Sequence, residues 1–279
     1  MIAALGAFDG LHKGHWKVLN YAGRNAGVIF FEPLPRQYFG GNKWHKRLTT
    51  PAERYELLQA NGICSIITLP FDSLTAGTLP KDFCKLLVDI DLFSGFVVGY
   101  DFRFGIGASG TIDELRKNLS TYGLTVTEVS SEDIEGVPVK SEMIRQLLLD
   151  GKLGKVSDLL GRAYDATGVV SRGKGIGRTL GFPTLNVRVP EAKLLPPAGS
   201  YASFARIGCT KYKAVAFVIP SRNLIEVHVS GLEEDLYGHK VSVEFISFIR
   251  EPSVYNENRM LIKAIKNDLD RSMEVLREC

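Results

Sequence analysis

The sequence lacks the features that would link it to a membrane or to a nucleic acid. No apolar run approaches the roughly 18 residues that a membrane-spanning helix needs. The apolar start carries no basic segment of the kind that opens a signal peptide. A formal net charge of only +3 gives no support for a nucleic-acid or anionic-membrane partner. Any anion site must therefore be local, and we expect a cytoplasmic protein.

Cysteine is too sparse and too dispersed to organise the fold. The four cysteines form neither a zinc knuckle nor a CxxC redox pair, and a chain of 279 residues needs no disulfides. Apolar residues make up 45% of the chain and charged residues 23%, which is the balance of a globular protein with a substantial core. We expect reduced, structural thiols.

The first half of the chain alternates strand and helix patterns. Thr50-Pro51-Ala52-Glu53 is a typical helix start, with a capping threonine, a proline in the first turn and an acid behind it. Strands separated by helices imply a parallel sheet with crossover connections. We expect strands over residues 2–5, 28–31, 63–69, 95–98 and 124–129, and helices over 14–25, 50–60, 81–88, 111–119 and 141–149.

The pattern changes after about Gly161. Glycine, proline and polar turns, rather than helices, now separate the strand-like runs, which predicts a compact antiparallel barrel or sandwich. A helix from about Asn258 closes the chain. We therefore expect an α/β domain over residues 1–158 and an all-β domain over residues 159–279. The strands of the second domain are expected at 166–170, 201–207, 214–219, 225–229 and 241–246.

The segment from Phe8 to His15 contains a candidate anion site. Glycine after a buried strand permits a sharp turn, and the next helix points its free amides and its dipole at whatever lies over the strand ends. Gly10 and Gly14 flank His12, and His15 lies three residues beyond it, so both imidazoles can face a phosphate. Taken alone, the pair also fits ordinary turn and helix residues, or a metal site.

The same segment resembles the HxGH motif of the nucleotidylyltransferase superfamily. The longer string around it resembles the FMN adenylyltransferase module of bacterial bifunctional FAD synthetases (riboflavin kinase/FMN adenylyltransferase). This resemblance implies a Rossmann-like N-terminal domain of the nucleotidylyltransferase type. In the first half it is carried, in order, by Gly6–His15, Phe31–Pro35, Leu48–Arg54, Val97–Gly105 and Val139–Arg145.

The resemblance implies that this domain transfers an adenylyl group from ATP to FMN. His12 and His15 would stabilise the ATP phosphates during in-line attack by the FMN phosphate. Ser141 and Arg145 would hold the same phosphates from the other side. Asp101 and its glycine-rich surroundings would line the nucleotide pocket. The remaining ATP- and phosphate-binding positions of this domain would be Phe8, Gly10 and Gly14.

A competing pattern occurs at Gly105–Gly110, which satisfies GxGxxG, with Glu128 about 20 residues beyond it. In a dinucleotide-binding fold the first glycine follows its strand almost immediately. Here six residues intervene after Val98, and they include Asp101, which a tight turn would not need. The pattern is weak by itself, and the sequence favours adenylyl transfer.

A second motif follows a glycine-rich loop that is by itself typical of a solvated turn. The string Gly181–Asn186 resembles the riboflavin kinase motif glycine–phenylalanine–proline–threonine–x–asparagine. The resemblance assigns Thr184 and Asn186 to the binding of the nucleotide and Mg²⁺, which prefers hard oxygen ligands. The loop would cover the phosphates through Gly175 and Arg178.

Glu226 lies in Ile225–His228, which resembles the strand that carries the kinase's general base. It would take the proton from the riboflavin 5′-hydroxyl as that oxygen attacks the γ-phosphate. Without the motif, an exposed glutamate on an alternating strand is the simpler interpretation. The resemblance implies a small β-barrel riboflavin kinase domain with a terminal helix.

Two places depart from the family pattern. Glu142 stands where the family usually has a small hydroxyl residue, and a carboxylate near a triphosphate repels it unless it points away or meets Mg²⁺. Residues 214–221 keep only Pro220 and the hydroxyl of Ser221 from the family segment that precedes the glutamate strand. That segment helps to hold flavin in the family.

The sequence therefore predicts two ATP- and Mg²⁺-dependent steps of FAD biosynthesis. Riboflavin is phosphorylated to FMN, and FMN is adenylylated to FAD with release of pyrophosphate. The alternatives are a monofunctional FMN adenylyltransferase and a flavin-binding protein with an impaired kinase domain. The expected partners are flavins and ATP, without nucleic acid or membrane.

Overall fold

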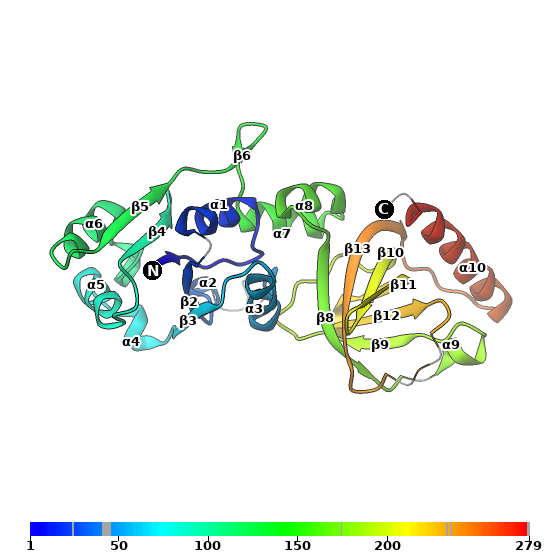
Figure 1. Cartoon of the computed structure of the whole chain (residues 1–279). Helices are drawn as coiled ribbons and strands as arrows, with labels where there is room; N and C mark the ends of the chain where they lie inside the picture. Colours follow the sequence, from blue (N-terminus) through cyan, green and yellow to red (C-terminus); the bar gives the residue numbers. More distant parts are fainter. Residues whose placement is uncertain (24, 41–45, 174, 233, 235, 278–279) are drawn as a thin grey trace. The chain divides into compact units, whose positions relative to one another are not determined.

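Residue contacts divide the chain into two units, Met1–Ser141 and Glu142–Cys279, which Figure 1 shows coloured along the sequence. The structure is a computed structural model that describes residues 1–23, 25–40, 46–173, 175–232, 234 and 236–277. The domain boundary expected at residues 158/159 stays a prediction.

The first unit is built on a five-stranded parallel sheet, as the alternating pattern predicts (Figure 1). The strand order is β3-β2-β1-β4-β5, and every neighbouring pair is parallel. The strands are β1 (Ile2–Leu5), β2 (Gly27–Glu32), β3 (Ser65–Pro70), β4 (Gly95–Gly99) and β5 (Thr125–Val129). The expected helices are α1 (Lys13–Ala22), α3 (Pro51–Ala60), α5 (Pro80–Asp89) and α6 (Ile112–Ser120).

Several short elements of the first unit were not expected from the sequence. None exceeds five residues, so their apolar periodicity is too short to read. They are α2 (Pro35–Phe39), α4 (Ser73–Ala76), the 3₁₀ turn η2 (Ile106–Ala108) and the hairpin of β6 (Asp133–Ile134) and β7 (Val137–Pro138).

Both faces of this sheet are buried, which is usual for a parallel sheet covered by crossover helices. Alternate strand residues enter two separate cores. One core combines Ala4 and Val28 with Leu19 of α1 and Leu58 of α3. The other contains the strand residues Leu5 and Ile29, together with α5 and α6 side chains that include Leu87, Leu115 and Leu119.

The start of α3 is confirmed in detail. The Thr50 Oγ1 atom accepts a hydrogen bond of 3.2 Å from the Glu53 backbone N–H. The Glu53 carboxylate accepts one of 2.8 Å from the Thr50 backbone N–H. This reciprocal cap fixes where the helix begins, and with it the direction in which Arg54 leaves the helix.

The second unit is a closed antiparallel barrel with the strand order β10-β11-β12-β9-β8-β13 (Figure 1). This confirms the barrel that the sequence predicts. Helix α10 (Asn258–Val275) packs against β10, β11 and β13. The strands are β8 (Tyr164–Ser171), β9 (Leu185–Arg188), β10 (Gly199–Ile207), β11 (Thr210–Ile219), β12 (Leu224–Val229) and β13 (Lys240–Arg250).

The remaining elements are short helices and turns. They are α7 (Ser141–Leu149), which was expected, and α8 (Leu153–Leu160), α9 (Ile176–Thr179) and the 3₁₀ turn η3 (Pro220–Arg222), which were not. Within the described ranges, no helix is both long enough and apolar enough to cross a membrane.

Candidate active sites

The loop after β1 makes a sharp turn before α1. Phe8, Gly10 and Leu11 have positive φ angles of 50°, 90° and 44°. A Cβ atom at Gly10 would also lie 2.8 Å from the Leu48 Cδ1 atom, so this position accepts only glycine without rearrangement. The turn leads into α1 at the carboxyl end of the parallel strands, where open α/β sheets bind their ligands.

His12 and His15 lie together at the N-terminus of α1. His12 is the N-cap residue, and its Nδ1 atom accepts a hydrogen bond of 3.3 Å from the His15 backbone N–H. A neutral His12 therefore carries its ring proton on Nε2. The two rings stack with centroids 3.6 Å apart. The predicted pair thus meets at a helix end whose amides and dipole favour an anion.

The surroundings of His15 keep its imidazole neutral. Burial, then the neighbouring His12, then Arg54 lower the pKa of His15 well below its usual value. Its Nδ1 atom is buried and makes no hydrogen bond among the described residues. A neutral imidazole can donate one N–H, so the pair offers hydrogen-bond donors to a phosphate rather than two full charges.

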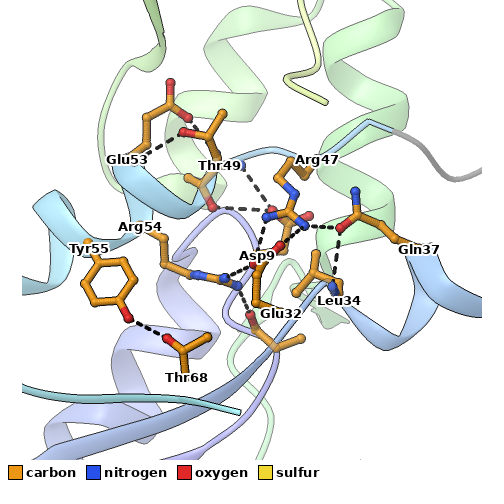
Figure 2. Close-up of polar contacts among 12 residues, drawn as sticks. Asp9, Glu32, Leu34, Gln37, Arg47, Thr49, Glu53, Arg54, Tyr55 and Thr68 are labelled. Carbon is orange, nitrogen blue, oxygen red and sulfur yellow. Dashed lines mark hydrogen bonds and ion pairs between the residues drawn. The ribbon is translucent and has the colours of Figure 1, made fainter. Parts of the chain in front are cut away.

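A buried ion-pair network lies beside this turn, as Figure 2 shows. Glu32, at the end of β2, accepts hydrogen bonds of 2.9 and 2.8 Å from Arg47 and one of 2.7 Å from Arg54. Arg54 also donates to the Ala7 carbonyl at 2.7 Å. No role was predicted for Glu32, Arg47 or Arg54 from the sequence, although Glu32 and Arg54 lie in two of the segments that carry the resemblance.

The predicted residues Asp101 and Ser141 are anchored within the first unit. Asp101 follows β4, the neighbour of β1, and its carboxylate lies 3.7 Å from the Lys140 Nζ atom. The Ser141 Oγ atom donates a hydrogen bond of 2.8 Å to the Asp9 carbonyl, which holds Ser141 beside the Phe8 turn. Its predicted phosphate contact stays a prediction.

Arg145 forms an ion pair with Glu142 within α7. The Arg145 Nη1 and Glu142 Oε2 atoms are 3.2 Å apart, and the two side chains are 12% and 49% exposed. The residue that departs from the family pattern therefore neutralises the arginine that is predicted to bind phosphate. The role of Arg145 itself stays a prediction.

The segment Gly105–Gly110 does not form a dinucleotide-binding turn. Strand β4 ends at Gly99, and the chain then forms η2, which is closed by a backbone bridge between Phe104 and Gly110. Helix α6 begins only after this bridge, with Thr111 as its cap. The direct strand-to-helix turn that the fingerprint requires is therefore not formed here.

In the second unit, the predicted kinase residues share one cavity. It measures about 750 Å³, and Gly175, Thr184, Asn186 and Glu226 all line it. In the antiparallel register, Glu226 of β12 lies opposite Asn186 of β9. The strand pairing thus joins two motifs that are distant in the sequence. The side chain of Arg178, also predicted here, lies outside the described part of the chain.

Glu226 is only partly accessible in this cavity. Burial raises the pKa of its carboxyl group, and the nearby Arg222 cation opposes that rise. A higher pKa makes the ionised carboxylate a stronger base. His228, two residues further along β12, has its Nδ1 atom 2.8 Å from the Pro183 carbonyl, which holds the loop just before Thr184. This contact of His228 with the loop was not predicted from the sequence.

The donor set of this cavity fits Mg²⁺. The Thr184 hydroxyl and the Asn186 amide supply hard oxygen ligands, and Mg²⁺ usually completes its coordination with water and substrate phosphates. The described residues contain no cluster of three or more His, Cys, Asp or Glu side chains that could hold a metal by itself. A Cβ atom at Gly173 would lie 2.3 Å from the Asn186 Nδ2 atom, so the glycine loop packs directly on this amide.

Two further groups of cavity residues were not expected from the sequence. Asp268 of α10 is 4% exposed and accepts hydrogen bonds of 2.8 Å from both Ser200 Oγ and Arg250 Nε. The segment that departs from the family pattern forms the end of β11 and η3. It lines the cavity with Val215 and Phe217, and the next residue of η3, Arg222, also lines it.

Two protein-family models match this chain, one on each half. A model described as FAD synthetase matches residues 1–143, and one described as riboflavin kinase matches residues 160–276. The first span contains the turn from Phe8 to His15, and the second contains the residues that line the barrel cavity.

Similar proteins cover nearly the whole chain. A bifunctional riboflavin kinase/FMN adenylyltransferase from Bacillus subtilis is 29% identical over 286 residues, which is 96% of this chain and 90% of that protein. One from Escherichia coli K12 is 33% identical over 264 residues, or 89% and 84%. A crystal structure described as a macrolide-efflux protein from Streptococcus pneumoniae has a TM-score of 0.84 at 27% identity and covers 98% of this chain and 93% of its own. The chain belongs to the family of bifunctional riboflavin kinases/FMN adenylyltransferases.

Proposed function

We propose that this chain converts riboflavin to FMN and FMN to FAD, using ATP and Mg²⁺ in both steps. The observation that carries the proposal is that each unit holds its own set of motif residues, the stacked histidines in one and the barrel cavity in the other. We assign adenylyl transfer to residues 1–158 and the kinase to residues 159–279. Flavins and ATP are its partners, without nucleic acid or membrane, and its location is the cytoplasm.

In adenylyl transfer, a phosphate oxygen of FMN attacks the α-phosphorus of ATP, and pyrophosphate leaves. The nucleophile is already an anion, so the protein positions the reactants and stabilises the charge that develops on the phosphates. The imidazole N–H groups of His12 and His15 and the amides of α1 supply these donors. Ser141 and Arg145 hold the leaving phosphates, Phe8, Gly10 and Gly14 shape the phosphate turn, and Asp101 lines the nucleotide pocket.

In the kinase step, the riboflavin 5′-hydroxyl attacks the γ-phosphorus of ATP, and ADP leaves. A hydroxyl must lose its proton, and Glu226 accepts it. Thr184 and Asn186 would hold Mg²⁺, which would supply positive charge at the phosphates. Gly175 and Arg178 belong to the loop that covers the nucleotide.

Incubation of the purified chain with riboflavin, ATP and Mg²⁺, followed by separation of the flavins, tests the whole proposal. We expect FMN to appear first and FAD to follow. FAD from supplied FMN without any FMN from riboflavin would restrict the activity to the first domain. The absence of both products would refute both activities.

We expect His12→Ala to slow FAD formation from FMN by roughly 10²–10³-fold, the usual cost of removing one charge-stabilising donor. The rate of FMN formation from riboflavin should not change. His239→Ala, which removes an exposed imidazole of the barrel, is the matched control and should alter neither rate. An unchanged adenylylation rate in His12→Ala would remove this residue from the mechanism.

Glu226→Gln should abolish FMN formation and leave FAD formation from FMN intact, because the amide cannot accept the hydroxyl proton. The matched control is Glu244→Gln, which alters a carboxylate that pairs with Arg206 and Lys211 on the barrel. It should keep both rates. Parallel loss of both activities in Glu226→Gln would contradict two separate sites.

The kinase rate should fall as the pH drops, with its acid limb above the usual pKa of a glutamate. Burial raises the pKa of Glu226, so the base is protonated at a higher pH than an exposed carboxylate would be. Arg222→Gln removes the cation that opposes this rise and should move the limb to still higher pH. A pH profile of kcat/KM for riboflavin measures the shift, and Arg206→Gln should leave the limb in place.

Glu142→Ser should lower the KM for ATP in adenylyl transfer by up to about fivefold. A partly exposed ion pair is worth at most about 1 kcal/mol, and the substitution releases Arg145 from this pair. Asp150→Ser removes an exposed acid near the end of the same helix and serves as the control. A KM that rises in Glu142→Ser would show that Glu142 assists nucleotide binding instead.

A further inference from the structure

Arg54 is a fully buried arginine beside the turn from Phe8 to His15. Its side chain is 0% exposed, and its guanidinium carbon lies 3.8 Å from the centroid of the Phe30 ring. One end of the guanidinium donates to the Ala7 carbonyl at 2.7 Å. The other end donates to Glu32 at 2.7 Å (Figure 2). Arg54 therefore joins the loop after β1 to the end of β2.

Stability alone is a poor reason for burying this side chain. Burial lowers the pKa of Arg54, which reflects the cost of removing its charge from water, and Glu32 opposes that effect. Glu32 is already paired with a cation, because Arg47 donates two hydrogen bonds to its carboxylate. Apolar residues of similar volume can replace buried ion pairs without loss of stability. The contact with the Ala7 carbonyl gives Arg54 a further role, because it reaches the loop after β1.

The Ala7 carbonyl is one of two anchors that flank Phe8. The second anchor is Asp9, whose carboxylate accepts a hydrogen bond of 3.0 Å from the Thr49 backbone N–H. Between them, Phe8 is 1% exposed and has a φ of 50°, which is unfavourable for a residue with a side chain and persists only where its surroundings determine it. The Phe8 ring contacts the His15 ring edge-on, with centroids 5.4 Å apart.

We propose that Arg54 is a positioning residue for adenylyl transfer, which holds the Ala7 carbonyl so that Phe8 and the two histidines keep their geometry. This inference rests on the proposed function of the first domain. It assigns Arg54 no contact with the substrates. Its loss should therefore lower kcat, because misplacing catalytic groups by about 1 Å can cost on the order of 10²-fold, while the substrate-binding surfaces stay in place.

The test compares three variants of the full chain in FAD formation from FMN. Arg54→Met removes the guanidinium and leaves Glu32 paired with Arg47, and we expect kcat to fall on the order of 10²-fold with the KM values for ATP and FMN within about threefold of the parent. Arg54→Lys restores a donor and should recover part of that loss. Arg47→Met is the matched control, since Arg47 bonds Glu32 but makes no bond to Ala7, and its kcat should stay within about threefold.

The titration of His15, followed by NMR, is a second readout, which reports the loss of the Arg54 cation beside the histidines. Arg54 lowers the pKa of His15, so Arg54→Met should raise it, whereas Arg47→Met should not. If Arg54→Met gives no folded protein, Arg54→Gln replaces it, because its shorter neutral side chain also leaves the Ala7 carbonyl without its cation.

The inference is overturned if Arg54→Met keeps kcat within about threefold of the parent, or if Arg47→Met loses as much as Arg54→Met. A fall in kcat with a parallel rise in both KM values would indicate general loss of structure and also overturn it. A parent chain that makes no FAD from FMN would instead refute the proposed function, so the two failures are distinguishable.

Discussion

The carboxylate of Glu32 forms ion pairs with two buried arginines, Arg47 and Arg54, beside the turn from Phe8 to His15. Without it, the buried Arg47 and Arg54 would lose the carboxylate that accepts hydrogen bonds from both of them, and removing one partner of a buried ion pair is strongly unfavourable. Its position follows from strand pairing, because β1 and β2 are parallel neighbours in the register Leu5 to Ile29. The loop after β1 therefore passes close to the end of β2.

The longer helices and the sheet strands of the first unit could be predicted from the sequence, but the order of the strands in the sheet could not. Strand and helix periodicity depends on which residues are buried, and the chain alternates clearly. The cap at Thr50 and Glu53 is likewise a local interaction within four residues, and it forms as expected. Glu32 and Arg54 are 22 residues apart, and their contact depends on β2 lying beside β1. No local sequence pattern predicts that strand pairing.

In the second unit, too, the contacts between cavity residues that are distant in the sequence could not be predicted from local patterns. Glu226 and Asn186 could be assigned only through their motifs, and the register of β12 with β9 then placed them opposite each other. Strand β9 was missed because its four residues include a polar Asn186 and a charged Arg188. Asp268 of α10 was also missed, because a buried carboxylate that is paired with Arg250 and Ser200 breaks the rule that the inner face of a helix is apolar.

The electrostatics of the two proposed sites differ in the way that their reactions require. The FMN phosphate is an anion before it attacks, so a site for adenylyl transfer needs donors and positive charge, and it needs no base. The first unit accordingly places the imidazoles of His12 and His15, of which that of His15 is kept neutral by burial, at the N-terminus of α1. The riboflavin hydroxyl must lose a proton, and the barrel cavity provides a carboxylate whose pKa is raised by burial. Both reactions stabilise phosphate charge, but only the kinase step also needs a proton acceptor beside the attacking oxygen, and this is the difference between the two proposed sites.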